Sequence, residues 1–431
     1  MKINRRSFLQ QSALGSASLA GTQHGLIANA AETVSYPKGS ADACIFIWLG
    51  GGAAHIDTFD PKKRGDGKKV PGSYYNAIDT ALPGVQVTEH LPNTAKILDR
   101  CILMRTLSHD IEAQHGAATN LVHTGRKPSE TVIYPSLGSI VSHQLGPKDD
   151  RVPSYVVMGY PNIARDPGFL GPQHGYIYLT QIETGPNGFT LPTDVSSSRQ
   201  QRREALLANW NNHYIERQPE NQQAEIQRAV SEQAFQMAGP KFLNVFNLEN
   251  ETDGIRRAYG SEFGQRCLLA RRLVQSGVRF VEVSFNLNFL NGTGWDTHND
   301  GQLRQHLLIQ DLDQAFAQLV KDLEKNRLLD STLVVIATEF GRPAAFDSGG
   351  GRGHQPGAFS GVLAGGGLHT GQALGTTDEL AKEIIDTPIS IPDFHATIHC
   401  ALGIRPSRRL FAGERPIPIT DHGKPVPQCF S

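Results

Sequence analysis

Short apolar runs of strand length recur along the chain and alternate with segments of helical spacing. Continuous apolar runs are typical of strands buried on both faces, and their alternation with helices is typical of parallel sheets. The pattern predicts a doubly wound α/β fold with a mostly parallel sheet and helices on both faces. The strand-like runs cover residues 43–49, 101–107, 154–158, 278–285, 333–337 and 360–363, and the helical segments cover 136–145, 263–276, 302–325 and 393–402.

Residues 1–30 have the features of an export signal of the twin-arginine type. Arg5 and Arg6 precede Phe-Leu, a weakly apolar stretch follows at 13–20, and 28–30 is a small-residue cleavage sequence, Ala-Asn-Ala. Such signals are addresses and not anchors. The alternative is an ordinary N-terminal helix with two arginines. We expect a bacterial protein that the twin-arginine machinery exports, already folded, to the periplasm or another extracytoplasmic location.

The remaining residues, 31–431, are expected to form a single α/β domain. Residues 197–240 interrupt it, because they are rich in Gln, Arg, Glu and Asn and poor in large apolar residues. We expect two exposed helices there, as an insertion or lid, or simply as a solvated helical face. Beyond the signal, no apolar run approaches the roughly 20 residues that span a bilayer.

Charge and cysteine usage exclude some classes of protein. The formal net charge is -1, and no basic stripe with interleaved aromatic residues occurs, which argues against a nucleic-acid partner. The five cysteines form no CxxC pair. Cys44 and Cys101 lie in strand-like runs, so buried thiols are the favoured interpretation, although an extracytoplasmic location would permit disulfides.

Five potential metal ligands follow apolar runs. In α/β folds, ligands bind beyond the carboxyl ends of strands, so carboxylates and imidazoles at these places indicate a divalent-metal site. Mixed nitrogen and oxygen donors favour Zn or Mn over Ca or Mg. The candidate ligands are Asp57, Asp296, His298, Glu339 and His354.

Each of these residues also has a simpler explanation. Asp57 could cap a loop, Glu339 could pair with Arg342, and any one histidine could be structural. A carboxylate at a buried strand end is costly to leave unpaired, which makes Glu339 more telling than the others. The metal hypothesis depends on the joint pattern of the five.

Glycines beside these ligands permit close approach of the backbone. Residues 50–52 are Gly-Gly-Gly, but they lack the lysine and hydroxyl of a P-loop and do not match GxGxxG. A second glycine-rich segment, 349–353, carries Arg352, which is suited to gripping an oxyanion, as is Arg342. Neither GxSxG nor HExxH occurs, which argues against a serine esterase and a zincin.

The segment 108–116 follows a strand-like run and precedes a short helix. Backbone N–H groups at a helix N-terminus can hold an anion, so a reacting phosphate or sulfate could bind there. His115 stands at this helix start, as a metal ligand or a nucleophile.

Several segments together resemble the DUF1501 family of exported bacterial proteins, which is placed in the alkaline phosphatase–sulfatase superfamily. They are WLGGGAAHIDTFDPK, HTGRKPS, FGQRCLLARRLVQSGVRFVEV, GWDTH, LLDSTLVVIATEFGR and LAGGG. The resemblance implies a metal cluster at the strand ends of a doubly wound domain. By this resemblance Asp57 is the first-strand metal aspartate, Asp296 and His298 are the central Asp/His pair, and His354 is the late metal histidine.

The chain departs from the superfamily pattern in three places. Glu339 stands where the superfamily has an aspartate, and Phe340 stands where it has the adjoining histidine. The nucleophilic Cys or Ser that precedes a Thr-Gly by nine residues is replaced by His115. Gly353 and Gln355 replace the acidic and aromatic residues of the GRDHW segment that is usual in DUF1501 proteins.

The leading hypothesis is an extracytoplasmic metal-dependent hydrolase of phosphate or sulfate esters, acting on a small molecule or a glycan. The alternative is a non-catalytic, metal-containing binding protein for anionic envelope components or sulfated glycans. A phosphoryl-transfer or isomerising relative is a third hypothesis. Elemental analysis tests for the metal, and assays of aryl phosphates and aryl sulfates distinguish a catalyst from a binder.

Overall fold

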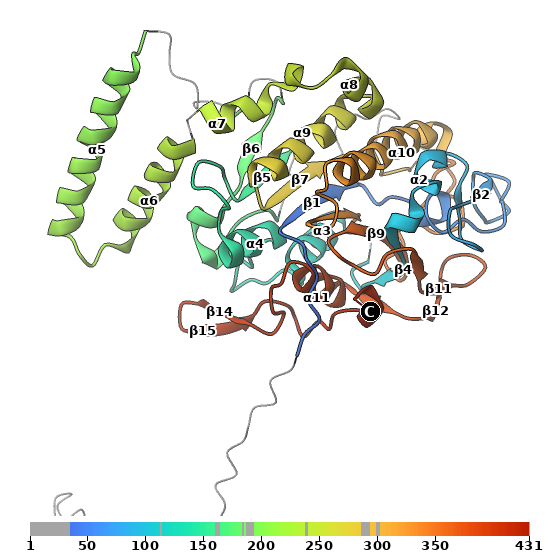
Figure 1. Ribbon diagram of the computed structural model, residues 1–431. Coiled ribbons are helices and arrows are strands. Elements are labelled where there is room, and N and C mark those ends of the chain that lie inside the picture. Colours follow the sequence, from blue (N-terminus) through green and yellow to red (C-terminus); the bar gives the residue numbers. More distant parts are fainter. Residues whose placement is uncertain are drawn as a thin grey trace, which may run out of the picture. The chain divides into compact units, whose positions relative to one another are not determined.

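The computed structural model places a mostly parallel sheet at the centre of the chain (Figure 1). Among the described residues, nine strands form it: β1(Ala43–Trp48), β4(Cys101–Ser108), β5(Tyr155–Met158), β6(Ile177–Leu179), β7(Phe280–Ser284), β8(Thr332–Ala337), β9(Phe359–Gly365), β10(Gln372–Leu374) and β13(Ile389–Ser390). Their order is β10-β4-β9-β8-β1-β7-β5-β6, and β13 also pairs with β4. Only β9 runs antiparallel to its neighbours, β4 and β8. The predicted α/β fold class is confirmed.

The structure describes residues 35–112, 114–159, 164–182, 185–186, 194–237, 240–285, 294–298 and 302–430. The chain divides into two units, Met1–Ser35 and Tyr36–Ser431, and the second holds all of the elements named here. The expected export signal at 1–30 lies outside the described residues.

Strand β1 shows why both faces of the sheet are covered. Ile45 and Ile47 belong to one hydrophobic core, whereas Phe46 and Trp48 belong to another. This alternation follows from the two-residue period of a strand. Helices pack on each side: α2(Pro92–Ala95), α9(Glu262–Ser276) and α10(Gln302–Lys325) on one, and α3(His115–Thr124), α4(Leu137–Leu145) and α11(Ile391–Ala401) on the other (Figure 1).

The helices start and stop where local chemistry favours it. The Ser261 hydroxyl accepts a hydrogen bond from the backbone of Gly264 at the start of α9, and Gly277, with φ of 114°, ends that helix. Ser390 is the N-cap of α11 and forms a capping box with Asp393.

The polar segment at 197–240 contains helices. They are α5(Ser197–Arg217) and α6(Gln222–Met237), which pack on each other, and α6 also contacts η4(Pro172–His174). None of the described helices combines the length and apolar character needed to cross a membrane. All five cysteines are buried and free. The smaller elements are α7(Pro240–Leu243), α8(Asp253–Tyr259), β2(Ala77–Asp79), β3(Gln86–Thr88), β11(Thr376–Thr377), β12(Ile384–Asp386), β14(Arg409–Ala412) and β15(Arg415–Pro418).

Candidate functional site

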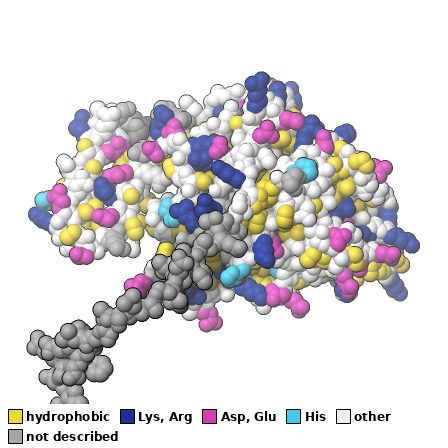
Figure 2. All heavy atoms as spheres, turned by 60° about the horizontal axis from the view of Figure 1, so that its bottom comes forward, with side chains coloured by type: hydrophobic (Ala, Val, Ile, Leu, Met, Phe, Trp, Pro, Cys, Tyr) yellow, Lys and Arg dark blue, Asp and Glu magenta, His cyan; other side chains and the backbone are white. Residues whose placement is uncertain are grey.

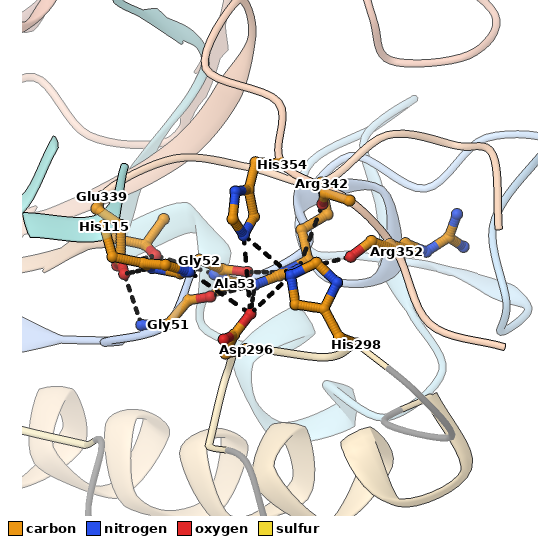
Figure 3. A network of polar contacts seen from close by, with 12 residues as sticks. Gly51, Gly52, Ala53, His115, Asp296, His298, Glu339, Arg342, Arg352 and His354 are labelled. Carbon is orange, nitrogen blue, oxygen red and sulfur yellow. Dashed lines mark hydrogen bonds and ion pairs between the residues drawn. The ribbon is translucent and has the colours of Figure 1, made fainter. Parts of the chain in front are cut away.

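The polar residues of the candidate site follow three strands, β4, β7 and β8, at one edge of the sheet. Strands β1, β4, β7 and β8 run in the same direction, so their carboxyl ends share that edge. His115 begins α3 after β4, and Glu339 follows β8. Asp296 and His298 come after β7, and His354 lies between β8 and β9. Figure 3 shows these side chains converging from separate loops.

His115, Asp296 and His354 form the centre of the site. Each offers one nitrogen or carboxylate oxygen, and these atoms all lie within 4.8 Å of one another. The Nε2 atom of His115 lies 3.6 Å from Asp296 Oδ1, and it is buried with no hydrogen-bond partner among the described residues. Because a buried polar atom is rarely left unpaired, this nitrogen fits a bound cation beside it.

His298 completes the cluster. Its Nε2 atom lies 3.0 Å from His354 Nε2 and 3.2 Å from Asp296 Oδ1. Three imidazoles and one carboxylate are a donor set suited to Zn or Mn. We name His115, Asp296, His298 and His354 the ring cluster.

Two carboxylates stand behind the ring cluster and orient its histidines. Glu339 Oε1 lies 2.8 Å from His115 Nδ1 and also accepts the backbone N–H of Gly51. Asp347 Oδ2 lies 3.3 Å from His298 Nδ1. Metal-binding histidines commonly contact a carboxylate through the ring nitrogen that faces away from the metal. The structure therefore places Glu339 behind the cluster, and not in it as expected from sequence.

Asp347 was missed by the sequence reasoning. It lies in the turn that leads into the glycine-rich segment, and its Oδ1 accepts the backbone N–H groups of Gly349 and Gly351. A carboxylate just before Gly-Gly-Gly-Arg-Gly-His was the available signal, because such a loop needs an acceptor to hold it.

Asp57 does not join the ring cluster, and its expected role as the first metal ligand does not fit this geometry. It lies in η1(His55–Asp57), beyond the glycine turn, and is fully buried. Its Oδ1 accepts from Tyr74 N and Arg352, and its Oδ2 accepts from Gln302 and Arg352. Four donors occupy the two oxygens, so Asp57 acts as a structural carboxylate.

The expectation that Arg352 grips an oxyanion is corrected in the same way. Its guanidinium points away from the ring cluster (Figure 3) and is fully buried. Two of its five N–H groups contact Asp57, and the others donate to the carbonyls of Pro343, Ala344 and Gly72. It retains no donor for a substrate.

Arg342 also holds the site together without facing a substrate. It is fully buried and pairs with Asp296 Oδ1. Its remaining donors fix backbone carbonyls of the two glycine-rich loops, namely Gly51, Gly52, Arg352 and Gly353. It positions Asp296, so the expected oxyanion-binding role does not fit this geometry either.

The glycine turn after β1 makes room for protein backbone. Gly51 has φ of 117°, and a Cβ atom there would lie 2.4 Å from the backbone nitrogen of Asp296. Gly52 is similarly covered by the ring of Phe340, whose ring centroid lies 4.8 Å from that of His115. Close contact with this turn therefore fixes the position of the Asp296 backbone.

A model of the family described as "Protein of unknown function (DUF1501)" matches residues 41–430. The chain belongs to the DUF1501 family. No curated protein matches it.

The DUF1501 chain is also similar to solved structures. Ps i-CgsB has a TM-score of 0.39 and 11% identity, with 86% of this chain and 73% of that chain covered. The lipoteichoic acid synthase LtaP from Listeria monocytogenes has a TM-score of 0.39 and 9% identity, with 89% of this chain and 76% of that chain covered. The phosphonate monoester hydrolase SpPMH from Silicibacter pomeroyi has a TM-score of 0.40 and 9% identity, with 89% of this chain and 76% of that chain covered.

The electrostatics of this DUF1501 site favour a positive charge at its centre. Burial opposes protonation of His115, but the nearby carboxylates of Asp296 and Glu339 raise its pKa to about 9. Burial would raise the pKa of Asp296, yet His115, His354 and Arg342 hold it well below its usual range. The carboxylates thus attract either a proton on His115 or a cation in its place.

Proposed function

We propose that the protein is a metal-dependent hydrolase of phosphate or sulfate esters that acts outside the cytoplasm. The observation that carries this proposal is the ring cluster, with ligand atoms of His115, Asp296 and His354 all within 4.8 Å of one another. His298 adds a third imidazole at 3.0 Å from His354. These four residues would hold a divalent ion, Zn or Mn by their donor types.

A bound divalent ion supplies Lewis-acid polarisation of the ester and lowers the pKa of water. The chain's own residues prepare that site. Glu339 and Asp347 fix the ring orientations of His115 and His298. Arg342 fixes Asp296 from the buried side. Orientation of this kind limits the reorganisation that catalysis requires.

His115 serves this proposal as a ligand and not as a covalent nucleophile. Its Nδ1 is committed to Glu339, and its Nε2 faces Asp296. A ring nitrogen whose lone pair binds an ion is not available to attack an ester. Water is therefore the proposed nucleophile, which removes the need for a hydroxyl or thiol at this position.

Elemental analysis of the purified protein tests the metal first. We expect about one or two equivalents of Zn or Mn, and loss of that metal in His354→Ala and His298→Ala. Assays of aryl phosphates and aryl sulfates with added Zn, Mn, Mg or Ca then test turnover. A folded protein that takes up no metal would overturn the proposal.

The second candidate is a non-catalytic binder of anionic esters on the same site. One observation favours this candidate. The first residue of α3 is His115, whereas covalent catalysis from this position would need a hydroxyl or thiol nucleophile. Metal and anion binding without turnover on either ester class would support it over the hydrolase.

The proposed location depends on residues 1–30. We expect replacement of Arg5 and Arg6 by lysine to retain the protein in the cytoplasm, because this export route reads the arginine pair. Cell fractionation measures the outcome, and unchanged export of the Lys-Lys variant would contradict it.

A further inference from the structure

Two neighbouring cavities lie on the face formed by α3, α11 and the β14–β15 hairpin. One has a volume of about 680 Å³ and the other about 830 Å³. Figure 2 brings this face forward and shows Lys and Arg side chains gathered near the centre of the view. The cavities share four lining residues, so they follow one another along one groove: Arg126, Tyr134, Arg415 and Asp421.

The groove has more positive than negative charge. Its two carboxylates, Asp110 and Asp421, are already paired with Lys127 at 2.6 Å and Arg126 at 2.9 Å. Three further cations line it and are exposed: Arg409, Arg415 and Lys424. Within the described part of the chain, none of these three forms an ion pair with a carboxylate.

Arg126 gives the groove a fixed wall. Its side chain is only 10% exposed, and it joins α3 to the segment around β15 through Asp421 and the carbonyl of Pro418. The guanidinium also lies 5.0 Å from the ring centroid of Tyr134. This residue belongs to the HTGRKPS segment, whose chemistry the ring cluster does not use.

One end of the groove reaches the neighbourhood of the ring cluster. Ser108, the last residue of β4, and His109 line the larger cavity. His109 Nε2 lies 2.6 Å from the backbone oxygen of Glu339, whose side chain orients His115. A molecule in the groove would therefore lie next to the loops that carry the cluster.

We propose that this groove binds an anionic polysaccharide chain, with Arg409, Arg415 and Lys424 contacting its sulfate, phosphate or carboxylate groups. All three unpaired cations line the smaller cavity, Arg415 lines the larger cavity as well, and Lys127 adds a cation, paired with Asp110, to the larger one. Positive charge in both cavities fits a ligand with repeated anionic groups. Tyr36, Tyr134 and five prolines present flat apolar surfaces to sugar rings. That the bound chain feeds an ester to the ring cluster rests on the proposed function, whereas the binding itself does not.

Binding of a dextran sulfate oligosaccharide to the full chain tests the groove, with neutral dextran as the uncharged comparison. At an ionic strength of about 0.15 M, we expect Arg409→Ala/Arg415→Ala/Lys424→Ala to weaken binding about tenfold or more. The control is Lys63→Ala/Lys68→Ala/Lys69→Ala, which removes the same charge from exposed lysines outside the groove. Equal weakening in both triple variants would overturn the proposal, as would equal binding of neutral dextran.

Further probes distinguish a polysaccharide from other polyanions, and the groove proposal from the metal-site proposal. Inorganic polyphosphate or a single-stranded oligonucleotide that binds as tightly, with the same dependence on the three residues, would contradict the polysaccharide assignment. His354→Ala should lose metal and keep dextran sulfate binding. The groove variant should keep its metal. Failure of the groove and failure of the metal site are thereby distinguishable, and both triple variants replace exposed residues whose folding a thermal melt can verify.

Discussion

Glu339 Oε1 lies 2.8 Å from His115 Nδ1, so the opposite ring nitrogen of His115 is turned toward Asp296. The same carboxylate oxygen accepts the backbone N–H of Gly51, which ties the end of β8 to the turn after β1. One side chain thus fixes both the direction of a ligand and the loop beneath it. Asp347 likewise orients the ring of His298 and accepts a backbone N–H of the glycine-rich loop.

Replacing Glu339 should weaken metal binding without removing a ligand. We expect Glu339→Ala to lower metal affinity about 10- to 100-fold, the usual effect of losing a carboxylate behind a metal-binding histidine. Glu339→Gln should lower metal affinity less, because the amide oxygen of glutamine can still accept a hydrogen bond from His115 Nδ1. Competition with a chelator measures affinity, and Glu249→Gln, at an exposed glutamate, is the control. Equal affinity in Glu339→Ala and wild type would contradict this orientation role.

Gly51→Ala should disturb the site through backbone contact alone. The added Cβ would lie 2.4 Å from Asp296 N, in a turn whose φ of 117° already disfavours side chains. We expect metal content to fall and the melting temperature to drop. Gly84→Ala is a matched control, since Gly84 also has positive φ, of 75°, but has open space around it. Equal metal loss in both variants would show that general strain, and not displacement of Asp296, is responsible.

Asp57→Asn should destabilise the fold and leave the metal in place. Removing one partner of a buried ion pair leaves Arg352 uncompensated, which typically costs about 3–5 kcal/mol. Asp296→Asn should instead lose metal, because Asp296 lies in the ring cluster. Chemical denaturation and metal content per folded molecule distinguish the two. Metal loss in Asp57→Asn at retained stability would restore Asp57 as a ligand.

The sequence predicted the sheet because its strands are buried on both faces and are therefore almost purely apolar. The run at 333–337 became β8 and the run at 101–107 became β4, each with ends within one residue of the expectation. Strand direction then placed His115, Asp296, His298 and His354 at one edge. This much follows from local pattern and from the topology of parallel sheets.

The partners of individual charges could not be predicted in the same way. Asp57 and Arg352 are 295 positions apart, and only the folded loops bring them together. Both have the residue types of a functional site, yet they neutralise each other in the interior. Asp347 had no strand before it and was overlooked, although its two oxygens serve the loop and His298. Pairings across such separations depend on loop conformation, which residue type alone does not determine.

A second buried charge cluster is formed by Glu282 of β7, His123 of α3 and Arg165, which lies in the loop after β5. Glu282 Oε1 lies 2.7 Å from an Arg165 nitrogen and 3.5 Å from His123 Nε2, and Glu282 and Arg165 are each about 1% exposed. Burial would raise the pKa of Glu282, but Arg165 and His123 lower it to about 2 from the ordinary value of 4.5. Its ionised form is therefore more favourable in the folded chain than in the unfolded chain.

Stability should consequently fall with acid through this carboxyl group. A depressed pKa stabilises the fold above pH 4.5, and that contribution, about 3 kcal/mol, is lost as the pH falls toward 2. Glu282→Gln lacks it at every pH, so the difference in unfolding free energy between wild type and variant should be large at neutral pH and shrink below pH 4.5. Urea denaturation at several pH values measures this difference, with the exposed Glu249→Gln as control. A difference that stays constant into acid would mean that Glu282 is not ionised in the fold.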